Sequence, residues 1–297
     1  MKLASWALSD TGRKREKNED SFLVCRGLQL FAVADGMGGH KGGARASSLA
    51  LEVLEHAVQS SVEDMAAAAE RLAANARLRW TDGTESTEDA RQTEEITSDD
   101  SDIRTQDVES AEIELVSLPP ATAVMRLAAQ KASHEVFREA SRDPELQGMG
   151  TTLTALLYDG GRMHLVHAGD SRAYVFRDGR IRQLTDDHSW TAEQVRRGLM
   201  TEEEAEESQF KHVITRSIGY EREVEVDSSG VVVQAGDCFL LCSDGLTNFV
   251  GEGELRDIME RSWYRNLPQT LVDLANARGG DDNITVVVVY AANHLET

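Results

Sequence analysis

Four short apolar runs in this chain each adjoin an aspartate that stands beside a glycine or in a short acidic motif. The motifs are Phe31-Ala-Val-Ala-Asp35-Gly36, Phe239-Leu-Leu-Cys-Ser-Asp244-Gly245, Gly169-Asp170-Ser171-Arg172 and Gly280-Asp281-Asp282-Asn283. A single Asp-Gly pair is usually only a turn. A chain that merely favours such turns would show random flanks, whereas each of these aspartates lies next to a strongly apolar run. The pattern therefore predicts strands whose ends carry carboxylates out of the core.

The rest of the sequence alternates strand-like and helix-like periods. The predicted strands are residues 3–8, 22–26, 30–34, 152–158, 163–168, 173–176, 180–184, 230–233, 238–242 and 284–290. The predicted helices begin at residue 44 and then span residues 62–80, 121–140, 191–207, 254–264 and 268–277. Turn residues at 159–161 and 178–179 indicate tight hairpins. Antiparallel sheets with separately grouped helices predict an α+β layered domain.

Length and composition exclude several classes of protein. A chain of 297 residues with 40% hydrophobic content can bury one sizeable core, as one large domain or two small ones. Its net charge of −21 argues against nucleic acid or an anionic membrane as a partner. The first eight residues are too short for a signal-peptide core, and the apolar run at 286–292 falls far short of the roughly 20 residues of a membrane span. We therefore expect a cytoplasmic protein.

The three cysteines fit a reducing compartment. Cys238 and Cys242 lie in one predicted strand, where four residues span about 13 Å. A disulfide needs Cα atoms within about 7 Å, so these two cannot pair, and Cys25 is left over. We interpret all three as small free thiols without a metal role.

One segment stands apart by its charge. Residues 81–114 hold thirteen acidic residues against two arginines, a net −11. Because few apolar residues are available there to offset the loss of chain entropy, we predict a mobile acidic insertion at 81–118. A solvated spacer is the simpler interpretation, and a regulatory or partner-binding role is the alternative.

Carboxylates at strand ends suit hard cations such as Mg²⁺ or Mn²⁺, which prefer oxygen ligands. A glycine after the aspartate lets the backbone turn sharply and leaves its carbonyl open as a further ligand. Two such ions can bind a phosphate between them and supply hydroxide. Near the start, Arg15 shares a charged loop with Asn18, Glu19 and Asp20, and a guanidinium binds phosphate in a bidentate manner. A charged solvated loop is the other interpretation of that segment.

Taken in order, six motifs resemble those of the type 2C-like (PPM) protein phosphatases in their bacterial form. They are Arg15 with Asn18-Glu19-Asp20, Phe31 to His40, Gly148-Met-Gly-Thr-Thr152, Gly169-Asp170-Ser-Arg172, Leu241-Cys-Ser-Asp244-Gly245 and Gly280-Asp-Asp282-Asn283. The resemblance covers nearly the whole chain apart from the acidic insertion. It implies a single domain over residues 1–297, built as an α/β/β/α sandwich of two antiparallel β-sheets flanked by helix pairs.

The resemblance also implies a centre that holds two Mn²⁺ or Mg²⁺ ions. Asp35 is then expected to bridge the ions, and the Gly36 carbonyl to serve the first. Asp244 and Asp282 are expected to bind the second ion. Asp170, together with Asp244, is expected to hold a weaker third ion.

Further roles follow from the same resemblance. Arg15 is expected to grip the phosphate. Asp20 and Glu19 are expected to orient metal-bound water, although Glu19 occupies a position that ligates directly in some relatives, and Asn283 is expected to support the site. Water activated by the ions then attacks phosphorus in line, without a phosphoenzyme.

The sequence departs from the family pattern at two places. Eukaryotic relatives carry a histidine directly after the Asp-Gly pair, and Met37 stands there in this chain. His40 is a nearby candidate, but the general acid stays unassigned and a metal-bound water is an equal candidate. Residues 186–213 resemble the mobile flap of the family without its usual His-Pro pattern, and His212 within them is a candidate for the third ion or a solvated side chain.

Other functions stay compatible with the sequence. A catalytically inactive relative that binds phosphoproteins or metals is the main alternative, although all the expected carboxylates are present. A calcium-binding module would need a dense Asp-x-Asp-x-Asp-Gly loop, which none of these motifs has. A small phosphate ester is a further possible substrate. For the phosphatase, we expect phosphoserine and phosphothreonine proteins as substrates, a cognate Ser/Thr kinase that acts on the same targets, and a monomer.

Overall fold

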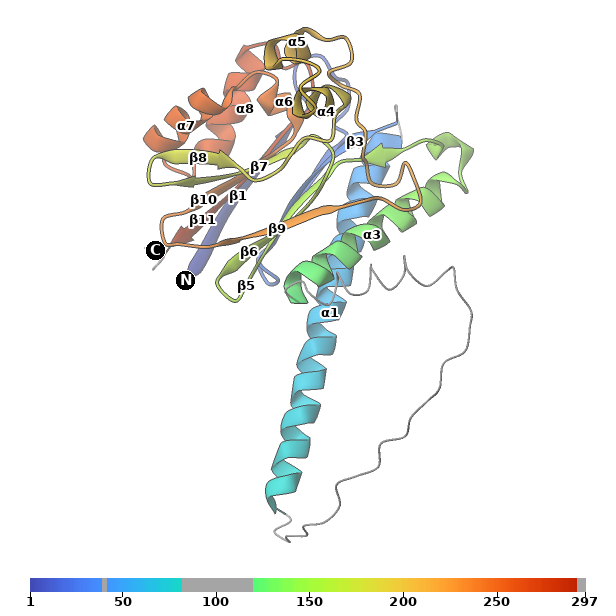
Figure 1. Ribbon diagram of the computed structural model, residues 1–297, viewed down its shortest axis with the longest axis vertical. Helices are drawn as coiled ribbons and strands as arrows, with labels where there is room; N and C mark the ends of the chain where they lie inside the picture. Colours follow the sequence, from blue (N-terminus) through green and yellow to red (C-terminus); the bar gives the residue numbers. More distant parts are fainter. Residues whose placement is uncertain (39–41, 82–119, 293–297) are drawn as a thin grey trace.

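The computed structural model describes residues 1–38, 42–81 and 120–292 (Figure 1). Two antiparallel sheets form its centre. The first has the strand order β1 (Lys2–Asp10), β11 (Ile284–Ala292), β10 (Cys238–Cys242), β7 (Arg172–Arg177) and β8 (Arg180–Gln183). The second has the order β2 (Asp20–Cys25), β3 (Leu30–Met37), β5 (Leu153–Asp159), β6 (Arg162–Ala168) and β9 (Asp227–Val232), and β4 (Gly150–Thr151) pairs with the end of β3.

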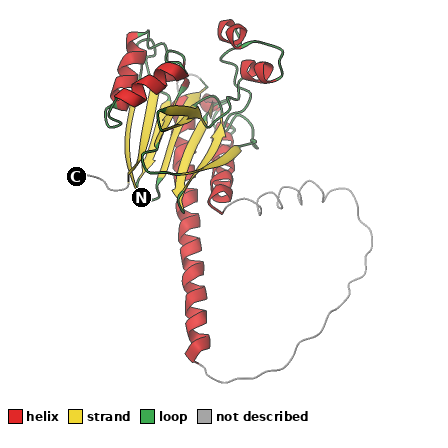
Figure 2. Ribbon diagram, turned by 60° about the vertical axis from the view of Figure 1, so that its left-hand side comes forward, coloured by secondary structure: helices red, strands yellow, loops and turns green. Residues whose placement is uncertain are grey.

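Helices cover the outer face of each sheet. The second sheet is covered by α1 (Gly42–Thr81) and α3 (Pro120–Ala140), which pack against each other, and a short helix η1 (Pro144–Leu146) follows α3. The first sheet is covered by α6 (Asp244–Thr247), α7 (Glu252–Arg261) and α8 (Leu267–Ala277). The expected α/β/β/α sandwich is therefore confirmed, as Figure 2 shows from the side.

The strands read as continuous apolar runs because the central ones are buried on both faces. In β10, Leu240 faces the helices, whereas Phe239 and Leu241 face the opposite sheet. In β3, Ala32 faces the helices and Phe31 faces the other sheet. Successive side chains of a strand point to opposite faces, so one run of five or more apolar residues supplies two cores at once.

Two helix predictions were wrong. Residues 44–80 form one helix of 40 residues together with their flanks, not two helices. Ser60 and Ser61 lie just before the predicted start of the second helix. They remain helical and donate hydrogen bonds to the carbonyls of His56 and Ala57, each at 2.9 Å. Figure 1 shows α1 continuing well beyond the sheets.

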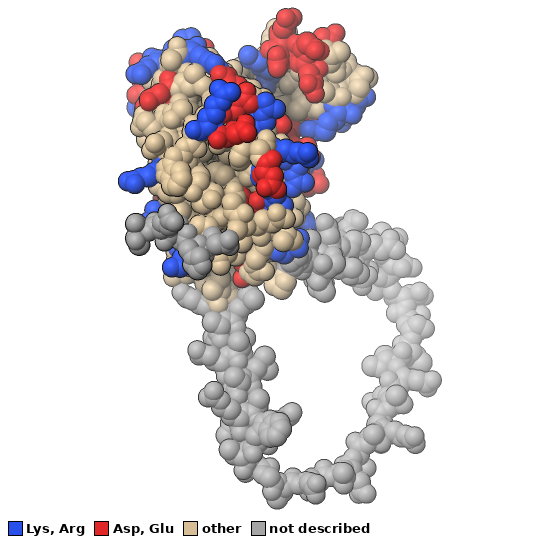
Figure 3. Space-filling model, turned by 90° about the vertical axis from the view of Figure 1, so that its left-hand side faces the viewer, with Lys and Arg blue, Asp and Glu red and all other residues tan. Residues whose placement is uncertain are grey.

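The predicted helix at 191–207 is also two helices, α4 (Trp190–Arg196) and α5 (Glu202–Glu207). Gly198 has a φ of +70° and ends the first, while Thr201 and Glu204 begin the second with a capping box. These helices stand clear of the sandwich in Figure 2. We call residues 186–213 the flap. Figure 3 shows acidic side chains gathered at its tip, over α5.

Other predictions concern cysteines, membranes and the insertion. Cys25, Cys238 and Cys242 are free thiols, as predicted. None of the helices that the structure describes is long and apolar enough to cross a membrane. The acidic insertion lies outside the described residues, except for Thr81 at the end of α1.

Candidate active site

The strand ends that carry the predicted carboxylates meet at one end of the sandwich. Asp20 and Asp35 are direct neighbours in the register of β2 and β3. Asp170 lies between β6 and β7, Asp244 begins α6 directly after β10, and Asp282 precedes β11. We call these five aspartates the floor.

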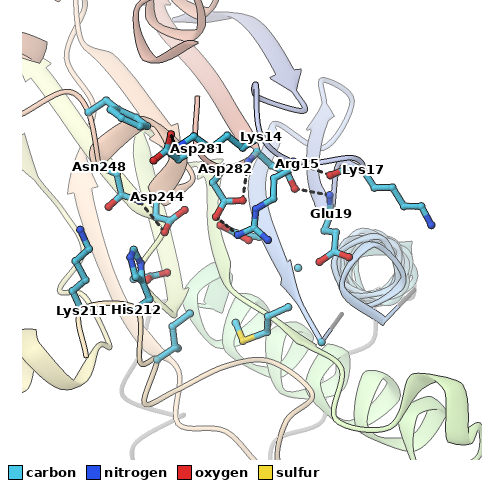
Figure 4. Close-up of a pocket in the computed structure, with 18 of the residues that line it drawn as sticks. Lys14, Arg15, Lys17, Glu19, Lys211, His212, Asp244, Asn248, Asp281 and Asp282 are labelled. Atoms are coloured by element: carbon cyan, nitrogen blue, oxygen red, sulfur yellow. Dashed lines mark hydrogen bonds and ion pairs between the residues drawn. The ribbon is translucent and has the colours of Figure 1, made fainter. Parts of the chain in front are cut away.

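Above the floor is a cavity of about 940 Å³ (Figure 4). The predicted site residues that line it are Arg15, Glu19, Asp35, Gly36, Asp170, His212, Asp244, Asp282 and Asn283. His40 lies outside the described residues. Nine of the nineteen residues that line the cavity are thus residues that the sequence and the family resemblance had pointed to.

Asp20 is buried beneath this cavity and is held by two hydroxyl groups. Ser243 Oγ and Thr285 Oγ1 both donate to its Oδ2, at 2.8 and 2.6 Å. Its Oδ1 is buried and has no hydrogen-bond partner among the described residues. Burial, which outweighs these hydrogen bonds, raises the pKa of Asp20 to about 7, with Asp244 adding repulsion.

Asp35 is fixed mainly through its backbone. Its N–H donates to Thr152 Oγ1 at 2.9 Å, and its carbonyl accepts from Thr151 Oγ1 at 2.8 Å and from the Thr152 N–H at 2.9 Å. Burial first, and then repulsion from Asp20, Asp244 and the other floor carboxylates, raise the pKa of Asp35 well above its usual range. The backbone is thus held while the carboxylate faces like charges.

Asp170 and Asp244, which are half-buried at the cavity, complete the group. Burial, followed by repulsion from Asp244, raises the pKa of Asp170 to about 8. Burial and then Asp282 also raise the pKa of Asp244. The Asn248 side chain donates to Asp244 Oδ2 at 3.1 Å, whereas Asp244 Oδ1 is buried without a partner among the described residues.

These observations fit a divalent-cation centre. Crowded carboxylates that are buried or half-buried repel one another, and a cation that binds between them removes both the repulsion and the unmet hydrogen-bonding capacity of their oxygens. Within the described residues, no three His, Cys, Asp or Glu side chains are already arranged to hold a metal ion. The fit therefore rests on charge, burial and the two partnerless oxygens.

The glycines beside the floor aspartates serve close packing. A Cβ at Gly36 would lie 2.1 Å from the Gly43 carbonyl oxygen, and one at Gly245 would lie 2.0 Å from the Asn283 carbonyl oxygen. Neither glycine has a positive φ, because Gly36 continues β3 and Gly245 lies in the first turn of α6. The expectation of sharp turns at these glycines was therefore wrong.

Arg15 and Asn283 organise the loop that precedes β2. Arg15 Nη2 lies 2.6 Å from Asp282 Oδ2, so the predicted phosphate-binding group contacts a predicted metal ligand. The Asn283 side chain donates to the carbonyls of Thr11 and Lys17, both at 2.9 Å, and accepts from the Glu19 N–H at 2.8 Å. The Asn283 side chain thus fixes the position of the loop that carries Arg15 and Glu19.

Sequence reasoning missed several supporting residues. Ser243 and Thr285 were not singled out, although each is a polar residue inside or beside an otherwise apolar strand run, which is a usable signal. Lys14, Lys17 and Lys211 also line the cavity, and no pattern in the sequence predicts where their flexible side chains lie. Figure 4 shows Lys211 and His212 on the flap side, near Asp244.

Comparisons with known proteins agree with this geometry. The protein phosphatase 2C family model matches residues 11–277. Serine/threonine phosphatase stp of Listeria welshimeri is 33% identical over 287 residues, which cover 95% of this chain and 93% of that protein. The crystal structure of Mycobacterium tuberculosis PstP/Ppp has a TM-score of 0.73 and 31% identity, covering 99% of this chain and 100% of that one.

A second PstP structure, of the catalytic domain in complex with two manganese ions, has a TM-score of 0.70 and 30% identity over 98% of this chain and 99% of that one. Together, fold and site define a metal-dependent protein phosphatase. The chain belongs to the protein phosphatase 2C family.

Proposed function

We propose that this protein hydrolyses phosphoserine and phosphothreonine in other proteins with two divalent cations, Mn²⁺ or Mg²⁺, held by the floor. The observation that carries the proposal is the group of five aspartates at one end of the sandwich. Burial raises the pKa of Asp20, Asp35, Asp170 and Asp244, and two of their oxygens have no hydrogen-bond partner among the described residues. Relatives named serine/threonine phosphatases, and a PstP structure with two manganese ions, support it.

In this proposal Asp35 would serve both ions, and the Gly36 carbonyl would serve the first. Asp244 and Asp282 would hold the second, and Asp170 with Asp244 would hold a weaker third ion. When bound, the ions supply Lewis acidity, which lowers the pKa of water and neutralises phosphoryl charge.

The chain's own groups then orient the reactants. Asp20, fixed by Ser243 and Thr285, has one oxygen left to accept from a water in the site. Glu19 lines the cavity beside it. Arg15 binds the phosphate oxygens, since its guanidinium lies at the cavity wall and can exchange part of its contact with Asp282 for the substrate.

The leaving serine or threonine oxygen needs a proton. Met37, which lines the cavity after the Asp-Gly pair, has none to give. Among the described residues lining the cavity, His212 is the one imidazole. The candidate donors are therefore His212, water in the site and His40, which lies outside the described residues.

The partners follow from the reaction. A cavity of about 940 Å³ that is flanked by a flap accommodates a phosphorylated side chain presented by a protein. A Ser/Thr kinase that acts on the same proteins is the expected counterpart, and we propose that the enzyme acts as a monomer.

The test is phosphate release from matched phosphoserine, phosphothreonine and phosphotyrosine peptides, with Mn²⁺, with Mg²⁺ and with chelator. We expect turnover of the first two peptides that requires a divalent ion. Binding of Mn²⁺ without phosphate release from any peptide would instead identify an inactive relative that binds metal or phosphoproteins.

A further inference from the structure

The loop that carries Asp170 has a backbone conformation that needs external support. Gly169 has a φ of +117°, and a Cβ there would lie 2.6 Å from the Thr152 side chain. Only glycine fits both conditions. The Ser171 hydroxyl lies 2.8 Å from Thr152 Oγ1, which also accepts from the Asp35 N–H. The position of Asp170 is therefore tied to neighbouring contacts.

His188 lies among the first residues of the flap, which we call the flap root, and provides one of these contacts. The Gly169 N–H donates to His188 Nδ1 at 3.1 Å, and the His188 N–H donates to the Gly169 carbonyl at 2.7 Å. His188 is buried, with 2% of its surface exposed. One residue of the flap thus holds both polar groups of Gly169.

The far side of His188 fixes the orientation of its ring. An amide N–H can only donate, so Nδ1 is the acceptor nitrogen and the ring proton lies on Nε2. Nε2 then donates to Asp227 Oδ2 at 3.1 Å, and Arg216 Nη1 donates to Asp227 Oδ1 at 3.0 Å. The His188 carbonyl also accepts from the Thr215 N–H at 2.8 Å, just beyond the other end of the flap. His188 therefore joins both ends of the flap to Gly169.

A second buried histidine packs on the first. The His167 ring stacks on His188 with centroids 4.8 Å apart. His167 Nε2 lies 3.1 Å from the Asp186 carbonyl, and the Thr154 hydroxyl lies 2.9 Å from His167 Nδ1 and 3.0 Å from the Ser171 carbonyl. Burial lowers the pKa of both rings, that of His167 to about 4, which agrees with neutral imidazoles. The pair fills the space between the flap root and the loop.

We propose that His188 is a positioning residue that joins the flap root to the Gly169-Asp170 turn, so that the flap and the Asp170 carboxylate are set together. His188 does not reach the reacting groups. It acts on Asp170 through the backbone of Gly169. Partners that orient a ligand from behind in this way typically change activity or metal affinity roughly 10–100-fold when removed.

Three substitutions separate this role from simple space filling. His188→Phe keeps the ring and loses both nitrogens. His188→Asn places a carbonyl oxygen near the position of Nδ1 and can still accept from Gly169, whereas His188→Gln places its amide near Nε2, toward Asp227. If the contact with Gly169 matters, Asn retains function better than Gln or Phe. If only ring volume matters, Phe retains it best.

The first readout is amide hydrogen exchange in residues 166–173, measured with chelator present. We expect the Gly169 amide to exchange about tenfold faster in His188→Phe and His188→Gln than in the wild type, as for a lost hydrogen bond, and to stay close to wild type in His188→Asn. Equal exchange in all three variants, or unchanged exchange in His188→Phe, would overturn the proposal. If these variants do not fold, Asp227→Ala takes their place, and unchanged Gly169 exchange in that variant would overturn it as well.

The second readout is the separation of kcat from KM with an aryl phosphate and Mn²⁺. In His188→Phe, kcat is expected to fall roughly 10–100-fold while KM changes little, because Asp170 rather than the substrate pocket is displaced. A kcat close to that of the wild type in this variant would contradict the proposal. This part rests on the proposed phosphatase activity. A wild type without turnover would refute that activity, and the exchange experiment would still decide the role of His188.

The matched control is His164→Asn. His164 is a buried histidine on the same strand as His167, bonded to Thr122 at 2.8 Å and remote from the cavity lining. Its substitution should lower thermal stability while leaving Gly169 exchange and kcat unchanged. Faster Gly169 exchange in this control would show a general loss of stability and would count against a specific role for His188.

Discussion

The floor and the flap are opposite sides of the same cavity and are built in opposite ways. Each floor aspartate lies at or next to the end of a strand. A hydroxyl group holds Asp20, a backbone contact holds Asp35, and the Asn248 side-chain amide holds Asp244. The flap is two helices of seven and six residues, with Leu199 71% and Phe210 46% exposed. We therefore expect the chemistry to depend on the floor and the choice of protein substrate to depend on the exposed helices of the flap, which contact the floor region through His188.

The largest effect is expected in the floor. Asp35→Asn should reduce turnover more than about 100-fold, which exceeds the loss from a group that only supports a ligand. Without divalent ions the same variant should be harder to unfold, because it removes a buried charge that four other carboxylates repel. Steady-state kinetics and urea denaturation measure both. Asp178→Asn, at an exposed turn, is the control, and a more easily unfolded Asp35→Asn would contradict the account.

The floor also predicts how stability depends on pH. Asp20 and Asp170 have pKa values raised to about 7 and about 8, so in chelator they favour the folded state fully below about pH 4. As the pH rises toward 8, this contribution to the free energy of unfolding is lost. The loss is up to about 1.4 kcal/mol for each pH unit by which the pKa of a carboxyl group is higher in the folded than in the unfolded chain. Denaturation at about pH 5 and about pH 8.5 tests this, on either side of the raised values, and Mn²⁺ should abolish the decrease. A higher stability at the alkaline pH in chelator would contradict this prediction.

A smaller effect is expected for residues that hydrogen-bond to the floor aspartates without lining the cavity. Ser243→Ala removes one of the two hydroxyl donors to Asp20 and should lower kcat about 10-fold, at the lower end of what such supporting groups contribute. Ser262→Ala, at the end of α7, provides the same change away from the cavity. If kinetics show the two variants to be equally active, the hydroxyl does not position Asp20.

The smallest effect is expected in the flap. Trp190→Ala removes an edge contact to Phe210, whose ring centroid lies 5.2 Å away. We expect KM for a phosphothreonine peptide to rise about 3- to 10-fold, as for the loss of one aromatic pair, while kcat/KM for an aryl phosphate stays within about twofold. Equal losses with both substrates would remove the functional distinction between flap and floor.

The same contrast explains what the sequence could predict. Asp35, Asp244 and Asp282 were found because a strand end leaves a local pattern, an apolar run beside an acid. The strands followed from period and turn residues, whereas the sandwich of two sheets was implied by the family resemblance. Gly36 and Gly245 were interpreted as turn residues. Their role in the structure is to allow a close approach to Gly43 and to Asn283, and a local sequence pattern does not reveal contacts between separate segments.

Residues that act across segments were harder to foresee. The contact between His188 and Gly169 joins positions that local patterns treat separately, and the position of Lys211 depends on a flexible side chain. The break at Gly198 in the flap was missed since its helical period continues on both sides. Long-range contacts and exposed side chains therefore mark the limit of sequence reasoning in this protein.

Whether the floor is the catalytic centre can be decided by counting Mn²⁺ ions in a calorimetric titration and following phosphothreonine-peptide turnover in the same preparations. The wild type should bind at least two ions per chain and release phosphate, whereas Asp244→Asn should bind at least one ion fewer and lose nearly all turnover. Undiminished ion binding together with undiminished turnover in Asp244→Asn would show that the floor is not the catalytic centre.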